Sequence, residues 1–189
     1  MKVLHTAIPE VLVLEPRVFG DSRGFFLERY NKRDFLKVTG LDVEFVQDNH
    51  SRSMRNVLRG LHYQIGRPQG KLVWAVVGEI YDVAVDMRKS SPTFGKWVGF
   101  ELSAQSGQVA WIPPGFAHGF LVVSEAAEVL YKTTDYYSPD CERTLLWNDR
   151  GLSIDWPLRV DTEPILADKD RNGTRFESAE YFGHIGSTP

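Results

Sequence analysis

A histidine stands in the middle of an apolar, strand-like stretch, Arg-Gly-Leu-His-Tyr-Gln at residues 59–64. An imidazole at position 62 allows three interpretations: a metal ligand, a catalytic base, or a buried histidine with a structural role. With a reference pKa of about 6.5, a histidine exchanges its proton readily near neutral pH, which suits a base. The rest of the chain has to discriminate among the three.

The metal interpretation depends on a second histidine at a recognisable spacing. From Gly107 the chain reads Gly-x5-Pro-x-Gly-x2-His and ends at His118, which resembles the second motif of the cupin superfamily of jelly-roll barrels. Metal-binding cupins complete this motif with Asn, where Val122 stands here. They carry His-x-His in the first motif, where residues 62–64 are His-Tyr-Gln. A transition metal needs three or four ligands, and the only further candidates are His50 and Glu79. We therefore predict no bound metal.

One basic stretch interrupts an otherwise acidic protein. No acidic residue lies between Asp48 and Glu79, whereas five basic residues do: Arg52, Arg55, Arg59, Arg67 and Lys71. Guanidinium groups bind phosphate or carboxylate through paired hydrogen bonds, so the stretch is a candidate site for a small anion. A solvated loop with acidic partners elsewhere in the chain is an equally good interpretation.

The relation between Arg59 and His62 depends on local strand geometry. Side chains alternate between the two faces of a strand, so this spacing places the two on opposite faces. A bulge at Gly60 would bring both to the same face. The sequence leaves the two geometries open.

Short apolar runs separated by turn residues account for most of the chain. Alternating or β-branched patterns predict strands at 11–19, 25–30, 43–51, 71–77, 80–87, 96–102, 108–113, 119–124 and 127–133. Gly78-Glu79 predicts a hairpin of 71–77 with 80–87. One short helix is expected in residues 31–40, with Asn31 as N-cap and Gly40 at its end.

Many short strands at regular spacing predict an all-β sandwich or barrel rather than βαβ units. From Ser138 onward Pro, Asp, Asn and Arg become frequent, with isolated apolar anchors at 145–149 and 154–157. This pattern predicts a lid or a wrapped C-terminal tail with short helical turns, rather than a second domain. The expected organisation is one domain covering residues 1–189.

Composition argues against several classes of protein. A formal net charge of −3 does not suit a general nucleic-acid binder or a protein of anionic membranes. No apolar run approaches the roughly 20 residues that span a bilayer. The single cysteine, Cys141, has no internal disulfide partner, and no N-terminal stretch resembles a signal peptide. We therefore expect a soluble cytoplasmic protein.

Six stretches taken together resemble one known family. In chain order they are VFGDSRGFF, FVQDNHS, LRGLHYQ, QGKLVWAVVGEIYDVAVDMRKSSPTFG, WIPPGFAHGF and YKTTDYYSP. This combination resembles the dTDP-4-dehydrorhamnose 3,5-epimerase family from about residue 3 to about residue 170. The resemblance implies a cupin-type jelly-roll barrel that needs no metal or cofactor. It also implies a dTDP-sugar substrate and a homodimer with swapped N-terminal strands. One departure is Trp74, where close family members often have Arg.

The same resemblance implies roles for individual side chains. The family's catalytic base falls on His62, its proton donor on Tyr131, and the lysine that supports the enolate on Lys71. The carboxylate that assists the base falls on Asp170, with Asp168 as a rival because the local match is looser. Substrate contacts fall on Gln47, Asn49, Arg59, His118, Glu142 and Lys169 and, serving the partner subunit's site, on Arg23 and Glu28.

The implied reaction inverts C3 and C5 of dTDP-4-dehydro-6-deoxy-D-glucose to give dTDP-4-dehydro-L-rhamnose. The C4 ketone acidifies the protons on both carbons, so a base on one face and an acid on the other suffice. Relatives that invert a single carbon, or that move the ketone, share most of these motifs. Two further hypotheses are a metal-dependent cupin enzyme and a non-catalytic module that binds a sugar or a nucleotide.

Overall fold

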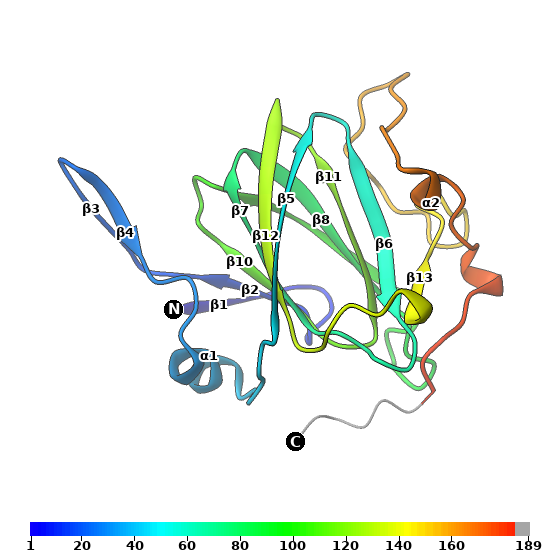
Figure 1. The fold of residues 1–189 in the computed structure, drawn as a ribbon, viewed down its shortest axis with the longest axis horizontal. Coiled ribbons are helices and arrows are strands. Elements are labelled where there is room, and N and C mark those ends of the chain that lie inside the picture. Colours follow the sequence, from blue (N-terminus) through cyan, green and yellow to red (C-terminus); the bar gives the residue numbers. More distant parts are fainter. Residues whose placement is uncertain (184–189) are drawn as a thin grey trace.

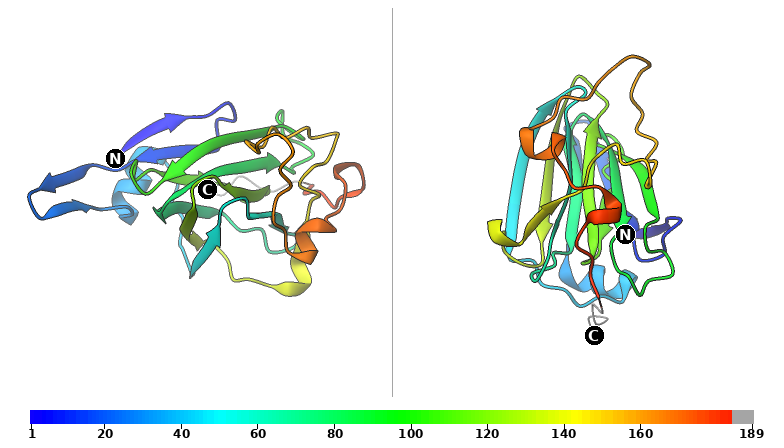
Figure 2. Two further views of the ribbon diagram at one scale, coloured as in Figure 1. Left: turned by 90° about the horizontal axis from the view of Figure 1, so that it is seen from above. Right: turned by 90° about the vertical axis from the view of Figure 1, so that its right-hand side faces the viewer.

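The computed structural model describes residues 1–183, and most of its regular structure is antiparallel β-sheet (Figure 1). A six-stranded sheet contains, in spatial order, β1 (Lys2–His5), β2 (Leu12–Glu15), β10 (Val109–Ile112), β7 (Lys71–Val77), β12 (Ala126–Thr133) and β5 (Gln47–Met54). A five-stranded sheet contains β13 (Glu142–Thr144), β6 (Leu58–Gln64), β11 (Phe116–Val122), β8 (Glu79–Asp86) and β9 (Trp97–Ser103). The two sheets form the layers of the predicted jelly-roll barrel (Figure 2).

The interior of the barrel is filled by the inward-facing residues of both sheets. Ile80 and Ala84 from β8 and Phe116 and Phe120 from β11 belong to one buried apolar cluster, together with Val129 from β12. Successive side chains of a strand alternate in direction, so the residues between these positions face outward. Polar residues at other inward positions can therefore gather in the barrel without facing bulk solvent.

The helix α1 (Lys32–Thr39) packs on the outer face of the six-stranded sheet. Its N-cap is Asn31, whose side chain accepts hydrogen bonds from two backbone N–H groups, and Gly40 ends it in a left-handed conformation, as predicted. Phe35 is almost fully buried, with its ring 5.6 Å from that of Trp111. Burial of such a side chain contributes about 1.5–3 kcal/mol to stability.

The C-terminal tail covers the outer face of the five-stranded sheet, which confirms the predicted wrapped tail. Leu145 and Trp156 from the tail pack in one cluster with Val83 and Val85 of β8. The tail contains three short helical turns: η1 (Pro139–Cys141), α2 (Asp168–Arg171) and η2 (Phe176–Ser178). Both faces of β8 are thus buried, one against the barrel interior and the other beneath the tail.

The predicted hairpin of residues 71–77 with 80–87 is wrong. β7 pairs with β10 and β12, whereas β8 pairs with β11 and β9 in the other sheet. Gly78 carries the chain between the two sheets with a φ of 70°. A Cβ here would lie 1.9 Å from the backbone oxygen of Ala126 and 2.4 Å from Ser124 Oγ, so the crossing requires glycine.

Several strand boundaries also differ from prediction. The predicted strand 11–19 is divided between β2 and β3 (Val18–Asp21), and 43–51 becomes a strand only from Gln47. β3 pairs with β4 (Gly24–Leu27) in a separate two-stranded sheet that projects from the barrel (Figure 1). Phe25 and Phe26 on β4 are 68% and 69% exposed.

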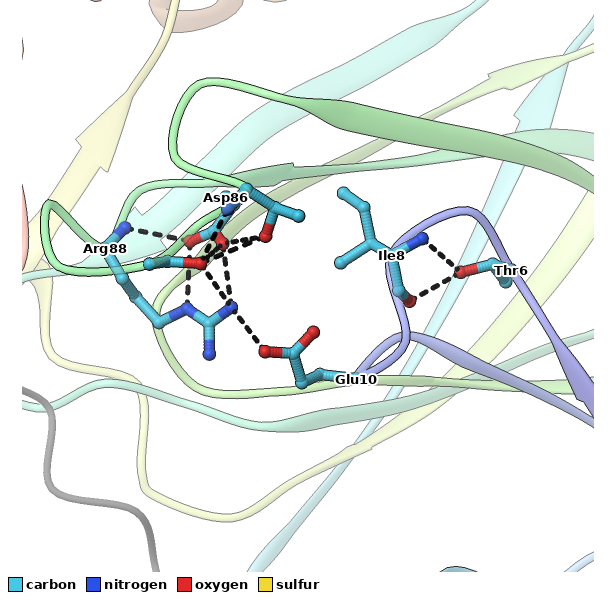
Figure 3. A network of polar contacts seen from close by, with 7 residues as sticks. Thr6, Ile8, Glu10, Asp86 and Arg88 are labelled. Atoms are coloured by element: carbon cyan, nitrogen blue, oxygen red, sulfur yellow. Dashed lines mark hydrogen bonds and ion pairs between the residues drawn. The ribbon is translucent and has the colours of Figure 1, made fainter.

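A buried ion pair fixes the loop between β8 and β9 (Figure 3). Asp86 is fully buried and accepts hydrogen bonds from the backbone and guanidinium of Arg88 and from the hydroxyls of Ser91 and Thr93. Arg88 also lies 3.2 Å from the carboxylate of Glu10, which precedes β2. The network therefore ties this loop to the N-terminal segment of the barrel.

Candidate active site

A pocket of about 380 Å³ opens between the two sheets. Its walls contain ten of the twelve residues that the sequence nominated: Gln47, Asn49, Arg59, His62, Lys71, His118, Tyr131, Glu142, Lys169 and Asp170. They come from β5, β6, β7, β11, β12, β13 and α2, so the fold gathers residues that are far apart in the chain.

His62 faces the pocket from β6 with a carboxylate behind it. Its Nε2 lies 2.6 Å from Oδ1 of Asp170, which the tail delivers in α2 and which is 2% exposed. Asp168, the rival carboxylate in the sequence, is exposed. Burial lowers the pKa of His62 below 6.5, and the hydrogen bond and charge of Asp170 oppose that effect. The net result is an imidazole that is neutral at pH 7.

A bulge in β6 decides the relation of Arg59 to His62. His62 is paired with His118 and Arg59 with Phe120, so three steps along β6 correspond to two along β11. The extra residue at Gly60 restores a common direction, and both side chains line the pocket. The bulge allowed by the sequence is therefore present.

Lys71 places a buried ammonium group in the same pocket. Its Nζ donates a hydrogen bond to the backbone oxygen of His62 at 3.1 Å, and its side chain is almost wholly enclosed. Burial lowers the pKa of Lys71 to about 8, although the carboxylates of Asp82 and Glu142 act in the opposite direction. The group is therefore still mostly positive at neutral pH.

Tyr131 lines the pocket from β12, in the sheet opposite His62. Burial raises the pKa of its phenol above 10, with smaller opposing effects from Arg59 and Lys169. The phenol is therefore protonated throughout the physiological range. The pocket consequently has a neutral imidazole on one wall and a proton-bearing hydroxyl on the other.

A chain of polar groups runs along β5 beside Tyr131. Asn49 is the cross-strand neighbour of Tyr131, and its Oδ1 accepts a hydrogen bond from Gln47 at 2.9 Å. The Nδ2 of Asn49 is buried and has no hydrogen-bond partner among the described residues. An unpaired buried donor is costly, so this amide suits an acceptor atom of a ligand.

Glu142 and Lys169 form an ion pair at the edge of the pocket. Lys169 Nζ lies 2.9 Å from Glu142 Oε1, and the hydroxyl of Tyr137 donates to the other carboxylate oxygen at 3.1 Å. Burial raises the pKa of Glu142, but the hydrogen bond from Lys169 and the neighbouring positive charges outweigh it and leave the pKa lowered. The carboxylate therefore stays ionised at neutral pH.

Sequence reasoning missed Asp82, the partner of His118. Both oxygens of this fully buried carboxylate lie within 3.0 Å of His118 Nε2. The alternating pattern of β8 held a signal, because Asp82 falls between Ile80 and Ala84, which share its face of the strand. An acidic residue at an inward position needs a partner inside the barrel.

The other two nominated residues, Arg23 and Glu28, lie elsewhere, and so does Trp74, the departure from the family pattern. Arg23 sits in the turn between β3 and β4, where it pairs with Asp21 at 2.5 Å, and Glu28 follows β4. Neither side chain reaches the pocket of its own chain. Trp74 is buried in the cluster beneath α1, on the outer face of the six-stranded sheet, so it packs away from Lys71's side of that sheet.

Two further properties concern residues 1–183. No three His, Cys, Asp or Glu side chains within this range are grouped so as to hold a metal ion. None of the helices in this range has the length and apolar character needed to cross a membrane.

Comparison with known proteins identifies relatives of one name along almost the whole chain. A family model described as dTDP-4-dehydrorhamnose 3,5-epimerase matches residues 5–178. The dTDP-4-dehydrorhamnose 3,5-epimerase of Pseudomonas aeruginosa is 60% identical over 182 residues, which covers 96% of this chain and 99% of that protein. The enzyme of the same name from Methanothermobacter thermautotrophicus is 47% identical over 90% of this chain and 92% of its own length.

Solved structures agree with this result. The dTDP-6-deoxy-D-glucose-3,5-epimerase of Legionella pneumophila, in complex with dTDP-4-keto-L-rhamnose, has a TM-score of 0.93 at 44% identity and covers 98% of this chain and 99% of its own. A 3'-monoepimerase of Streptomyces bikiniensis, in complex with dTDP-quinovose, has a TM-score of 0.85 at 32% identity, covering 93% and 88%. The fold, the pocket and these relatives lead to one conclusion: this chain belongs to the dTDP-4-dehydrorhamnose 3,5-epimerase family.

Proposed function

We propose that this protein inverts C3 and C5 of dTDP-4-dehydro-6-deoxy-D-glucose and releases dTDP-4-dehydro-L-rhamnose. The observation that carries the proposal is the placement of His62 and Tyr131 in opposite sheets of one pocket, with a buried ammonium beside them. Relatives 47% and 60% identical bear the name of this activity, and the Legionella pneumophila structure contains the product-type sugar nucleotide.

The first step removes a proton from a carbon beside the ketone. The Nε2 of His62 is engaged with Asp170, which leaves the lone pair on Nδ1 to accept the proton from C3 or C5. The C–H electron pair then delocalises onto the C4 oxygen as an enolate. Asp170 stabilises the imidazolium that forms, and positioned proton transfer of this kind contributes about 10²- to 10⁴-fold in rate.

The second step returns a proton from the other face of the sugar. The ammonium of Lys71 stabilises the enolate oxygen, and loss of such a group typically costs about 2.7–4 kcal/mol of barrier. The phenol of Tyr131 donates its proton to the carbanion carbon, which inverts that centre. Each inversion leaves His62 protonated and Tyr131 deprotonated, and the two groups exchange protons with solvent before the second carbon reacts. The steps need no oxidant or reductant, so the chemistry requires no cofactor.

The remaining polar groups suit the nucleotide. Arg59 brings a guanidinium to the pocket, and such a group binds diphosphate oxygens well. The unpaired Nδ2 of Asn49 offers a further donor beside Tyr131. Binding energy from these contacts would hold the sugar in register with the base and the acid.

We further propose that the protein is a cytoplasmic homodimer in which each subunit lends its N-terminal strands to its partner. Arg23, in the turn of the projecting sheet, and Glu28, directly after its second strand, lie outside the pocket of their own chain, and the aromatic residues of this sheet are exposed. Aromatic surface of this kind favours association. A cytoplasmic location suits a chain whose single cysteine, Cys141, is a free thiol.

Proton NMR of the substrate in deuterated buffer tests the activity directly. We expect enzyme-dependent loss of the proton signals at both C3 and C5, together with formation of the L-rhamno product. Exchange confined to one carbon would instead identify a single-carbon epimerase, the activity named for the Streptomyces bikiniensis relative. Stoichiometric dTDP binding with no exchange would reduce the protein to a binding module.

A further inference from the structure

The pocket contains a second histidine–carboxylate pair beside the first. His118 and His62 are cross-strand neighbours on β11 and β6, and each ring meets its own buried carboxylate. The first carboxylate, Asp170, arrives from the tail, whereas Asp82 belongs to β8 within the barrel wall. His118 lines the pocket and Asp82 does not, so Asp82 acts on a ligand only through its neighbours.

The three carboxylates near Lys71 differ in how far their negative charge is neutralised by a partner of their own. Glu142 forms an ion pair with Lys169, whose positive charge counteracts its effect on Lys71. Asp170 is held by His62. The only hydrogen-bond and ion-pair partner of the Asp82 carboxylate among the described residues is the imidazole of His118, which, unlike a guanidinium, is not a permanent cation. The negative charge of Asp82 is therefore the one least cancelled by a partner of its own.

The positions of Lys71 and Asp82 also indicate that the charge of Asp82 acts on Lys71. The Nζ of Lys71 is hydrogen-bonded to the backbone of His62, the residue paired with His118 across the sheet. This arrangement holds the ammonium beside the strand pair that carries His118, while Asp82 lies behind that ring. Both Lys71 and Asp82 are removed from solvent, so their interaction is only weakly screened.

We propose that Asp82 is a positioning residue that orients His118 and supplies the negative charge that keeps the ammonium of Lys71 ionised. This inference rests on the proposed epimerase function, because it assigns Asp82 a task in stabilising the enolate. By accepting Nε2–H of His118, Asp82 also leaves the other ring nitrogen to face a ligand.

The ionisation of Lys71 makes this role measurable. Burial has already lowered the pKa of Lys71 to about 8, close to the pH at which the enzyme would work. Removal of a nearby opposite charge typically lowers the pKa of a lysine by about 1 unit or more. Without Asp82, much of the protein would therefore hold a neutral Lys71 at pH 8 and lose enolate stabilisation.

Asp82→Asn isolates the charge, because the amide oxygen can still accept the hydrogen bond from His118. We expect unchanged dTDP affinity, and an alkaline limb of kcat/KM that moves down by about 1 pH unit. The activity at pH 8 relative to pH 6.5 should then fall by about fourfold relative to wild type. Asp82→Ala, which also frees His118, should lower kcat across the whole pH range. An alkaline limb that stays in place in Asp82→Asn would overturn the proposal.

Asp86→Asn is the matched control. Asp86 lies on the same strand and the same inward face and is equally buried, but its partners are Arg88, Ser91 and Thr93, away from the pocket. It should lower the melting temperature and leave the alkaline limb in place when assayed below that temperature. An equal shift in both variants would mean that the limb reports general destabilisation, and the proposal would be wrong.

Carbon-13 NMR of labelled lysine side chains gives a readout independent of turnover. In Asp82→Asn the Lys71 titration should move to lower pH than in the wild-type protein. A Lys71 titration at the same pH in wild type and in Asp82→Asn would refute the proposal, whatever the activity of the variant. Absence of deuterium exchange by wild type would refute the epimerase function alone. The Lys71 titration would still show whether Asp82 supports the charge of Lys71.

Discussion

At the level of single residues, the protein separates an acid from a base by their surroundings. Burial lowers the pKa of His62 and raises that of Tyr131, because in each case it disfavours the charged form. At neutral pH the imidazole is therefore free to accept a proton and the phenol has one to donate. Lys71, whose pKa is lowered to about 8, supplies a positive charge in the same pocket.

Replacing the base should stop the chemistry and spare binding. His62→Asn removes the proton acceptor, so we expect deuterium exchange at C3 and C5 to fall by about 10²- to 10⁴-fold. Calorimetry with dTDP should give an affinity close to wild type, because the nucleotide would bind through other side chains. Equal loss of binding and exchange would indicate a structural histidine.

The pH dependence of kcat/KM should be bell-shaped. Activity rises as His62 loses its proton, so the acid limb should lie below pH 6.5, where burial has moved the pKa of His62. Activity falls again near pH 8 as Lys71 loses its charge. Lys71→Arg keeps a permanent charge and should abolish the alkaline limb, whatever its effect on kcat. A limb near pH 8 that persists in this variant would belong to another group.

At the level of elements, the site depends on where the chain changes sheets. β7 carries Lys71 in one sheet and β8 carries Asp82 in the other, although only Gly78 separates the two strands. The short α2 in the tail then adds Asp170, 108 residues beyond His62. The crossing and the tail therefore matter as much to the site as the strands that bear its side chains.

Gly78→Ala should destabilise the fold strongly. An L side chain at this positive φ costs about 1–2 kcal/mol, and the clash with Ala126 and Ser124 adds to that. We expect a loss of more than about 2 kcal/mol in urea denaturation. Gly183→Ala, where a Cβ would meet nothing within 4 Å, is the control and should be nearly neutral. Similar losses in both would contradict the clash.

The Asp86 network should make stability fall in acid. Burial raises the pKa of Asp86, but hydrogen bonds from Arg88, Ser91 and Thr93 outweigh it and leave the pKa below 3.8. Because the folded pKa is depressed, the stabilisation is present above the unfolded value and is lost as pH falls through the folded one. Asp86→Asn should cost about 3 kcal/mol at pH 7 and less near pH 3. A difference that does not shrink in acid would contradict this assignment.

At the level of the whole molecule, the projecting β3–β4 sheet is the feature that the barrel by itself does not explain. It carries Arg23 in its turn and exposes Phe25 and Phe26, while the pocket of the same chain lies elsewhere (Figure 1). A second subunit that receives this sheet would bury the aromatic rings and complete its own site. In the proposed dimer, the same contact would therefore bury apolar surface and complete the active site.

Mixing two inactive variants tests this arrangement. Arg23→Ala should disable the partner subunit's site, and His62→Asn should disable its own. If sites are shared, unfolding and refolding the two together should restore up to about a quarter of the wild-type sites, because one site of each mixed dimer is intact. Mixing without subunit exchange is the control. Continued inactivity after verified exchange would show that each chain uses its own Arg23.

The sequence by itself determined the barrel class, the helix between Asn31 and Gly40, and the residue types of the site. These depend on local pattern: period-two alternation, a capping side chain, a left-handed glycine and motifs of fixed spacing. The tertiary structure decided which sheet each strand joined, and so overturned the hairpin at Gly78. It also decided that Arg59 and His62 share a face, that Asp170 rather than Asp168 meets His62, and that Asp82 lies behind His118. Such facts depend on contacts between residues far apart in the chain, and local pattern carries no information about which distant strand or carboxylate will be the neighbour.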